Sequence, residues 1–140
     1  MGSVARTDER HDTETDVQRV LEYLRLTEAG RLDEARAYLS PRVRHTFPGG
    51  REFTDLSEWL GWFRARMKRV RKRDHEIDVC HAANGDLVIY VRGFLEGETT
   101  SGHTFDGVRF IDRFAVSDGE IVEQQVWNDL AACGVEPGRK

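Results

Sequence analysis

Residues 105–129, FDGVRFIDRFAVSDGEIVEQQVWND, decide the fold of this chain because their side-chain types alternate with a period of two. Such alternation is typical of β-strands, whose successive side chains point to opposite faces of a sheet. Ser117-Asp118-Gly119 is a turn signal in the middle of the stretch, so two strands joined as a hairpin are predicted. On the first strand, Asp112 shares one face with four apolar residues, namely Val108, Phe110, Phe114 and Val116.

Asp112 is therefore a carboxylate on an apolar face. A buried carboxylate must be paired, hydrogen-bonded or protonated, because burying the bare charge costs more free energy than a domain can spare. Asp112 is the first candidate for a functional group. The structural alternative is an aspartate that forms a salt bridge with a neighbouring arginine.

Upstream of this hairpin, apolar residues recur at helical spacing in three segments. Residues 15–30 form the first predicted helix, which Gly30 ends, and residues 31–39 form the second, which Pro41 stops. The third helix begins after Asp55, and its apolar stripe consists of Leu56, Trp59, Leu60, Phe63, Met67 and Val70.

The remaining segments alternate as strands do. Residues 43–47 predict a short strand before the third helix, and residues 77–81 and 87–95 predict two strands joined by the turn Asn84-Gly85-Asp86. The order is helix, helix, short strand, helix and then four strands. Helices followed by an antiparallel meander predict an α+β fold in which the sheet curls over the helices.

The bulk composition fits one domain of 140 residues with a net charge of -4. We expect this domain at residues 15–130, between a flexible N-terminal arm at residues 1–14 and a C-terminal tail at residues 131–140. Cys80 and Cys133 lie far apart, which favours a reducing compartment. No apolar run approaches the ~20 residues that cross a bilayer, and the first residues do not resemble a signal peptide. We expect a cytoplasmic protein with no membrane partner.

The basic residues between 64 and 73 are interpreted as a solvated face at the end of the third helix, where cations complement the helix dipole. No aromatic residue interleaves with them to stack on bases, so no nucleic-acid partner is expected. His75, Asp78 and His81 do not share one face of a strand, so no metal site is expected either.

Several motifs carry a resemblance to a known superfamily. The order of FPGG, RGFLEG, RFIDRF and DGEIVEQQVWND resembles that of nuclear transport factor 2-like proteins, closest to their SnoaL-like and ketosteroid-isomerase-like members, over residues 15–130. The resemblance implies a cone-shaped, strongly curved antiparallel β-sheet packed on three N-terminal helices and enclosing an apolar pocket, also described as a cystatin-like α+β roll. It leaves the activity open, because this scaffold hosts several enzymes and non-enzymes.

The resemblance to ketosteroid isomerases implies three catalytic residues. Tyr23, seven positions before Gly30, matches their tyrosine; His45 stands where they have the catalytic base; and Asp112, in Phe110-Ile111-Asp112, matches their protonated aspartate. By this comparison Tyr23 and Asp112 would hold an enolate oxygen while His45 removes the adjacent proton. Alternatively, Asp112 stays ionised and orients His45 as a dyad.

Other chemistries of the fold are less favoured by the sequence. SnoaL-like cyclases carry a His and an Asp on the last strand, where this chain has Gln124 and Val126. The epoxide hydrolases need carboxylates where this chain has Phe94 and Val126, although Arg92 is present. A dehydratase or an epoxide hydrolase is therefore the less favoured reading.

We expect a cofactor-free enzyme of isomerase or cyclase type, which binds a small hydrophobic molecule and removes a proton next to a carbonyl. The alternative is a non-catalytic ligand-binding or accessory protein of the same fold. The predicted substrate-binding residues are Trp59, Phe63, Phe110, Phe114, Gln124 and Asn128. A homodimer is expected through the convex sheet face, which carries Ile111, Trp127, Arg109 and Arg113.

Overall fold

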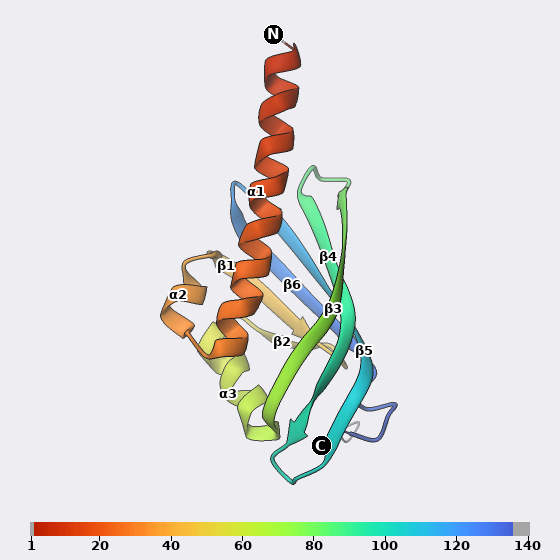
Figure 1. The fold of residues 1–140 in the computed structure, drawn as a ribbon. Coiled ribbons are helices and arrows are strands. Elements are labelled where there is room, and N and C mark those ends of the chain that lie inside the picture. The colour runs from red at the N-terminus through yellow and green to blue at the C-terminus, as the bar shows by residue number, and fades with distance from the viewer. Residues whose placement is uncertain (1, 136–140) are drawn as a thin grey trace.

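The computed structural model describes the backbone of residues 2–135 and the side chains of residues 13–135. Three helices and six strands follow one another in this part of the chain (Figure 1). The elements are α1 (Gly2–Ala29), α2 (Leu32–Arg36), β1 (Leu39–Phe47), β2 (Arg51–Phe53), α3 (Leu56–Arg66), β3 (Met67–His81), β4 (Leu87–Thr99), β5 (Thr104–Ser117) and β6 (Glu120–Asn128). The predicted α+β class and element order are confirmed, with β2 as an additional short strand.

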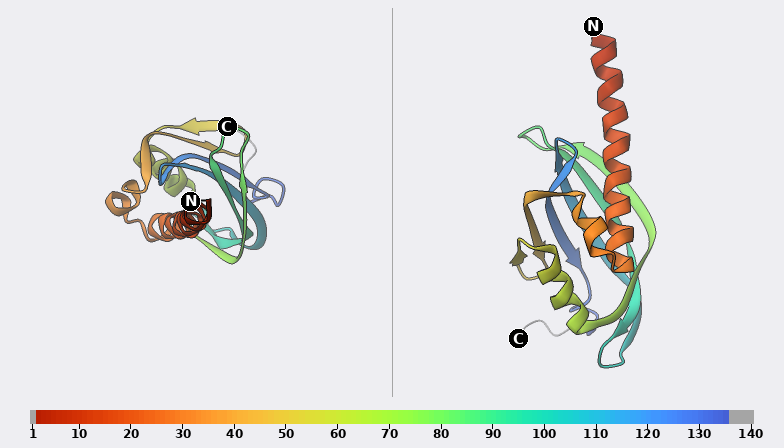
Figure 2. Two further views of the ribbon diagram at one scale, coloured as in Figure 1. Left: turned by 90° about the horizontal axis from the view of Figure 1, so that it is seen from above. Right: turned by 90° about the vertical axis from the view of Figure 1, so that its left-hand side faces the viewer.

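All six strands form one sheet in the order β2-β1-β6-β5-β4-β3. The meander from β3 to β6 is antiparallel, as predicted, but β1 runs parallel to β6. The sheet is therefore mixed, and the prediction of a purely antiparallel sheet is wrong. Figure 2 shows the sheet curving around α1 and α3, which lie on its concave side. The core and the buried polar groups lie between these two layers.

Helix α1 begins at Gly2 and not at Thr15, the predicted start. Its C-terminal half packs on the sheet through buried residues such as Val20, Tyr23 and Leu24, whereas its N-terminal part extends beyond the sheet (Figure 1). A helix forms its hydrogen bonds within its own backbone, so a segment can prolong a helix without joining the core. The mobility of residues 1–14 stays a prediction.

The second and third helices are shorter than predicted. Helix α2 ends at Arg36 because Leu39 already pairs with Ile121 of β6. Helix α3 ends at Arg66, and the last two residues of its predicted stripe, Met67 and Val70, lie on β3. Pairing with β4 along the whole of β3 overrides the local helical pattern.

Two glycines allow β3 to lie close against β4. At Gly97, a Cβ atom would overlap the backbone carbonyl of Arg69, and at Gly93 it would overlap that of Arg73. Only glycine, which lacks a Cβ atom, permits this approach. Residues 67–73 of the basic segment are consequently a strand, whereas Arg64 and Arg66 lie in the last turn of α3, as expected. On the strand, Arg71 and Arg73 form ion pairs with acidic residues.

None of the helices in residues 2–135 combines the length and the apolar character that crossing a bilayer requires.

Candidate functional site

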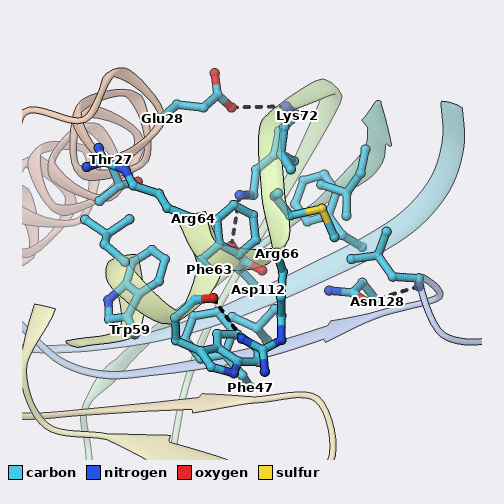
Figure 3. A pocket seen from close by; sticks show the side chains of 18 of the residues that line it. Thr27, Glu28, Phe47, Trp59, Phe63, Arg64, Arg66, Lys72, Asp112 and Asn128 are labelled. Carbon is cyan, nitrogen blue, oxygen red and sulfur yellow. Dashed lines mark hydrogen bonds and ion pairs between the residues drawn. The ribbon is translucent and has the colours of Figure 1, made fainter. Parts of the chain in front are cut away.

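A cavity of about 150 Å³ lies between the concave face of the sheet and helices α1 and α3 (Figure 3). Its wall is mostly apolar and aromatic. Five of the six predicted substrate-binding residues line it, namely Trp59, Phe63, Phe110, Gln124 and Asn128. The sixth, Phe114, is fully buried behind the wall, where its ring makes an edge contact with Tyr23 at 6.0 Å.

Asp112 lies on the wall of this cavity. It stands on β5 between Val91 of β4 and Val126 of β6, and it is 1% exposed. Among the described residues its Oδ1 has no hydrogen-bond partner. Burial raises the pKa of Asp112 to about 6, although the nearby ammonium group of Lys72 acts in the opposite direction. Asp112 is thus a carboxyl group that exchanges its proton close to neutral pH.

The cation nearest to Asp112 is a lysine that the sequence analysis did not select. Lys72 Nζ lies 4.0 Å from Asp112 Oδ2 and 5.4 Å from the centre of the Phe110 ring (Figure 3). Lys72 pairs in register with Leu95, a buried residue of the concave face. The structural alternative for Asp112 was a salt bridge with an arginine; among the described residues the cation at ion-pair distance is the lysine Lys72 instead.

Lys72 was missed because residues 67–73 were assigned to a helix. Read with the period of a strand, Val70 and Lys72 share a face with each other, and this signal would have pointed Lys72 inward. The backbone N–H of Lys72 also donates to the carboxylate of Glu28 at 3.0 Å, which joins β3 to the C-terminal end of α1.

Tyr23 and His45 meet at Gln124. The Tyr23 hydroxyl donates to Gln124 Oε1 at 3.2 Å, and His45 Nδ1 lies 2.8 Å from the same oxygen. The parallel pairing of β1 with β6 places His45 directly opposite Gln124. Because an amide oxygen only accepts hydrogen bonds, His45 donates through Nδ1–H, which leaves Nε2 as a lone-pair acceptor without a partner among the described residues.

The His45 imidazole and the Tyr23 hydroxyl are both neutral in this environment. Burial lowers the pKa of His45, and the hydrogen bond to Gln124 opposes this only in part. Burial also raises the pKa of Tyr23 well above its ordinary value, which keeps the hydroxyl protonated. Because Tyr23 and His45 are uncharged, they can bond to the buried amide of Gln124 without a counter-ion.

The structure thus brings Tyr23, His45 and Gln124 together but separates two of them from the cavity. Gln124 and Asp112 line the cavity, whereas Tyr23 and His45 are fully buried and do not. No hydrogen bond joins Asp112 to His45 within the described residues, so the dyad alternative has no support in this geometry. The predicted trio is split between the wall and the layer behind it.

Residues 13–135 contain no group of three His, Cys, Asp or Glu side chains placed to hold a metal ion. The two cysteines, Cys80 and Cys133, are both exposed and unpaired. The polar side chains that line the cavity include the amides of Gln124 and Asn128, the carboxyls of Glu28 and Asp112 and five cationic groups. Amide and cationic N–H donors are suited to binding oxygen atoms of an organic molecule.

Comparison with known proteins identifies relatives of this fold. A family model described as a SnoaL-like domain matches residues 20–124. Among curated proteins no sequence match was found. A nuclear transport factor 2-like protein of unknown function from Burkholderia pseudomallei has 19% sequence identity and a TM-score of 0.67, covering 85% of this chain and 94% of its own.

Two further solved structures are similar. TerC, co-crystallised with polyporic acid, has 15% identity and a TM-score of 0.69, covering 86% of this chain and 95% of its own. A candidate polyketide cyclase from Xanthomonas campestris has 20% identity and a TM-score of 0.67, covering 87% of this chain and 96% of its own. These similarities confirm the predicted nuclear transport factor 2-like fold.

Proposed function

The chain belongs to the SnoaL-like domain family, and we propose that its cavity binds a small, mostly apolar molecule on which Asp112 performs proton transfer. The activity would be of isomerase or cyclase type and would need no cofactor. The observation that carries this proposal is Asp112 itself, a buried carboxyl on the cavity wall with an oxygen that has no partner among the described residues. A pKa of about 6 suits a group that must both accept and release a proton near neutral pH.

The proposed step is proton removal next to a carbonyl. An oxygen of ionised Asp112 takes a proton from the carbon beside the carbonyl, and the C–H electron pair moves to form an enolate. Lys72 Nζ, 4.0 Å from Asp112, supplies positive charge for the developing enolate oxygen. Asp112 then returns the proton to a different carbon, which completes an isomerisation. Alternatively, the enolate carbon attacks a second carbonyl in the same molecule, which closes a ring, and the alkoxide that forms takes the proton back from Asp112.

This proposal changes the roles expected for Tyr23 and His45. Neither side chain lines the cavity, so neither would contact the substrate directly. Through their bonds to Gln124 Oε1, they instead hold the amide of Gln124 in one orientation, with its NH2 group available to the cavity. Lys72 takes the place of Tyr23 as the group that stabilises the oxyanion.

A second candidate function is ligand binding without chemistry. It is favoured by the separation of the three predicted catalytic residues, because only Asp112 lines the cavity, whereas Tyr23 and His45 do not. The co-crystal of TerC with polyporic acid supports a small organic molecule as a ligand of this fold. Under this reading Asp112 and Lys72 orient the ligand, and no bond is broken.

Hydrogen–deuterium exchange separates the two functions. A panel of cyclic ketones and enones is incubated with the protein in D2O, and exchange at the carbon next to the carbonyl is followed by NMR. We expect Asp112→Asn to reduce the exchange rate by about 10²–10⁴-fold, the usual contribution of a general base, while ligand affinity stays within about tenfold. Asp33→Asn, at a side chain that is 99% exposed, is the matched control. Binding without exchange in the wild-type protein would favour the non-catalytic function.

We also propose that two copies associate through the convex face of the sheet. Trp127 is 49% exposed there and lies opposite Ile111 in the β5–β6 register. Arg109 is paired with Asp129 at 2.6 Å, and Arg113 with Glu123 at 3.1 Å. With these charges already neutralised within one chain, the exposed apolar groups are what a second copy would cover.

A further inference from the structure

Asp112 and Lys72 lie close together on the cavity wall. The Asp112 carboxyl has a buried Oδ1 without a hydrogen bond among the described residues, as do the indole nitrogens of Trp59 and Trp62, and the side chain of Lys72 is 21% exposed. Their separation of 4.0 Å is too long for a hydrogen bond between them. Buried acceptors are almost always hydrogen-bonded, so Asp112 Oδ1 is available to a ligand group that Lys72 also contacts.

We propose that Lys72 and Asp112 together bind the anionic oxygen of a ring-bearing organic acid, and that the acid is taken up with one proton, which Asp112 holds. Lys72 donates to the anionic oxygen, and protonated Asp112 donates a second hydrogen bond to it. The class includes ring carboxylates and acidic enols. The inference rests on the proposed function, because this complex has the charge distribution of the proposed enolate intermediate.

The size and lining of the cavity indicate one ring. An apolar cavity of about 150 Å³ holds a benzene molecule. Here the wall includes Trp59, Phe63 and Leu95, while the ring of Phe110 lies beside the ammonium group of Lys72. A single ring would therefore fill the interior with one substituent directed toward Lys72 and Asp112 (Figure 3).

The charges around the cavity favour an anion, although the chain as a whole has a net charge of -4. Five cationic side chains and two acidic ones line the cavity, the cations being Arg64, Arg66, Lys68, Arg69 and Lys72 and the acids Glu28 and Asp112. Arg69 is paired with Glu98 at 3.7 Å. Arg64 and Lys68 have no carboxylate within ion-pair distance in the side chains that the structure describes. The charge of the cavity lining is thus positive on balance.

The proposed uptake of one proton follows from the closeness of the bound anionic oxygen to the Asp112 carboxyl. Two negatively charged oxygens cannot share one buried site, so one of them must be protonated. The groups that interact with Asp112 are Lys72 from β3 and the neutral hydroxyl of Tyr23 from α1. The uncharged amide of Gln124 lines the same cavity, and His45, which is bonded to that amide, is also neutral. Among the described residues at ion-pair distance from Asp112, Lys72 therefore supplies one positive charge for two acidic groups, Asp112 and the ligand. One negative charge balances it, and the second acid keeps its proton.

Titration calorimetry with matched ligands tests both parts of this inference. The probes are 2-naphthoate and methyl 2-naphthoate as a larger pair, benzoate and methyl benzoate as a one-ring pair, and a cyclic 1,3-diketone as an acidic enol. At pH 7 we expect an acid to bind at least about tenfold more tightly than its ester, since a hydrogen bond to a charged group is the stronger kind. Titrations in phosphate and in Tris, whose ionisation enthalpies differ, should show uptake of about one proton per acid and none per ester.

Three variants assign the two effects to their residues. Lys72→Met should remove the preference for the acid, and Asp112→Asn should remove the proton uptake while the acid still binds. Arg71→Met, on the same strand but with a side chain that is 72% exposed, should change neither quantity. Circular dichroism of each variant establishes that it is folded before the titration.

The outcomes separate this inference from the proposed function. Equal or tighter binding of the esters would overturn the inference and leave the proposed apolar cavity intact. Unchanged proton uptake in Asp112→Asn would overturn the role of Asp112 as the proton carrier in the complex. If neither acids nor esters bind to the wild-type protein, the inference and the proposed function both fail.

Discussion

Replacing Asp112 by asparagine should make the protein more stable at neutral pH. Burial raises the pKa of Asp112 from 3.8 in the unfolded chain to about 6 in the folded one. The folded state therefore binds the proton more tightly than the unfolded state does. The stability that the protonated group contributes is fully present below about pH 4 and is lost as the pH rises through about 6.

The size of the effect follows from the pKa difference. A shift of ~2 pKa units corresponds to ~3 kcal/mol at 1.36 kcal/mol per unit, and Asp112 is fully buried, so solvent does not screen it. An asparagine has the shape of the protonated acid but no ionisation to lose. Asp112→Asn should thus exceed the wild type by up to ~3 kcal/mol at pH 8 and by close to nothing at pH 4. The attraction between Lys72 and the carboxylate is already contained in the pKa of about 6.

Urea denaturation at five pH values between 4 and 8 measures this difference directly. Asp33→Asn, an exchange at an exposed site, is expected to stay within about 0.5 kcal/mol of the wild type throughout. A difference between Asp112→Asn and the wild type that does not change with pH would refute the reasoning. A variant that is less stable than the wild type at pH 8 would refute it as well, because the carboxylate would then be favourably solvated or paired.

Three further predictions concern other parts of the molecule. Tyr23→Phe removes the hydroxyl that donates to Gln124, and urea denaturation should show a loss of about 1–2 kcal/mol. Gly97→Ala would overlap the backbone of β3 and should cost more than about 2 kcal/mol, whereas Gly61→Ala, in a helix with open space around it, should gain up to about 1 kcal/mol; an equal effect of the two would contradict the close approach. Trp127→Glu should convert the proposed dimer to a monomer, as measured by light scattering. The stability of the monomer should fall by no more than about 1 kcal/mol. A wild-type protein that stays monomeric at high concentration would exclude the dimer.

The parts of the fold that could be predicted are those that neighbouring residues determine. The alternation on either side of Ser117-Asp118-Gly119 predicted the β5–β6 hairpin, and it placed Asp112 on the buried face. The turn at Asn84-Gly85-Asp86 was equally local. In these segments the period, the turn residues and the burial all agree, so the local pattern is sufficient.

The errors arise where distant segments decide the structure. The apolar stripe that continued through Met67 and Val70 fits a helix, and only the partner strand β4 makes it a strand. The same error hid Lys72, since its side chain points inward only because β3 pairs with β4. The parallel register of β1 with β6 likewise sets His45 against Gln124, and no residue near either of them signals it. The residues of the site were thus largely foreseen, but their arrangement was not.

The position of β6 in the sheet has a consequence for folding. This strand is the last one within residues 2–135, yet it lies in the middle of the sheet, between β1 and β5. Before it joins, the sheet consists of two separate parts, β2-β1 and β5-β4-β3. The contact of Tyr23 with Gln124 spans 101 residues and that of His45 spans 79, so their loop-closure entropy is large. During synthesis, neither the complete cavity wall nor the hydrogen bonds of Tyr23 and His45 to Gln124 can form before β6 leaves the ribosome.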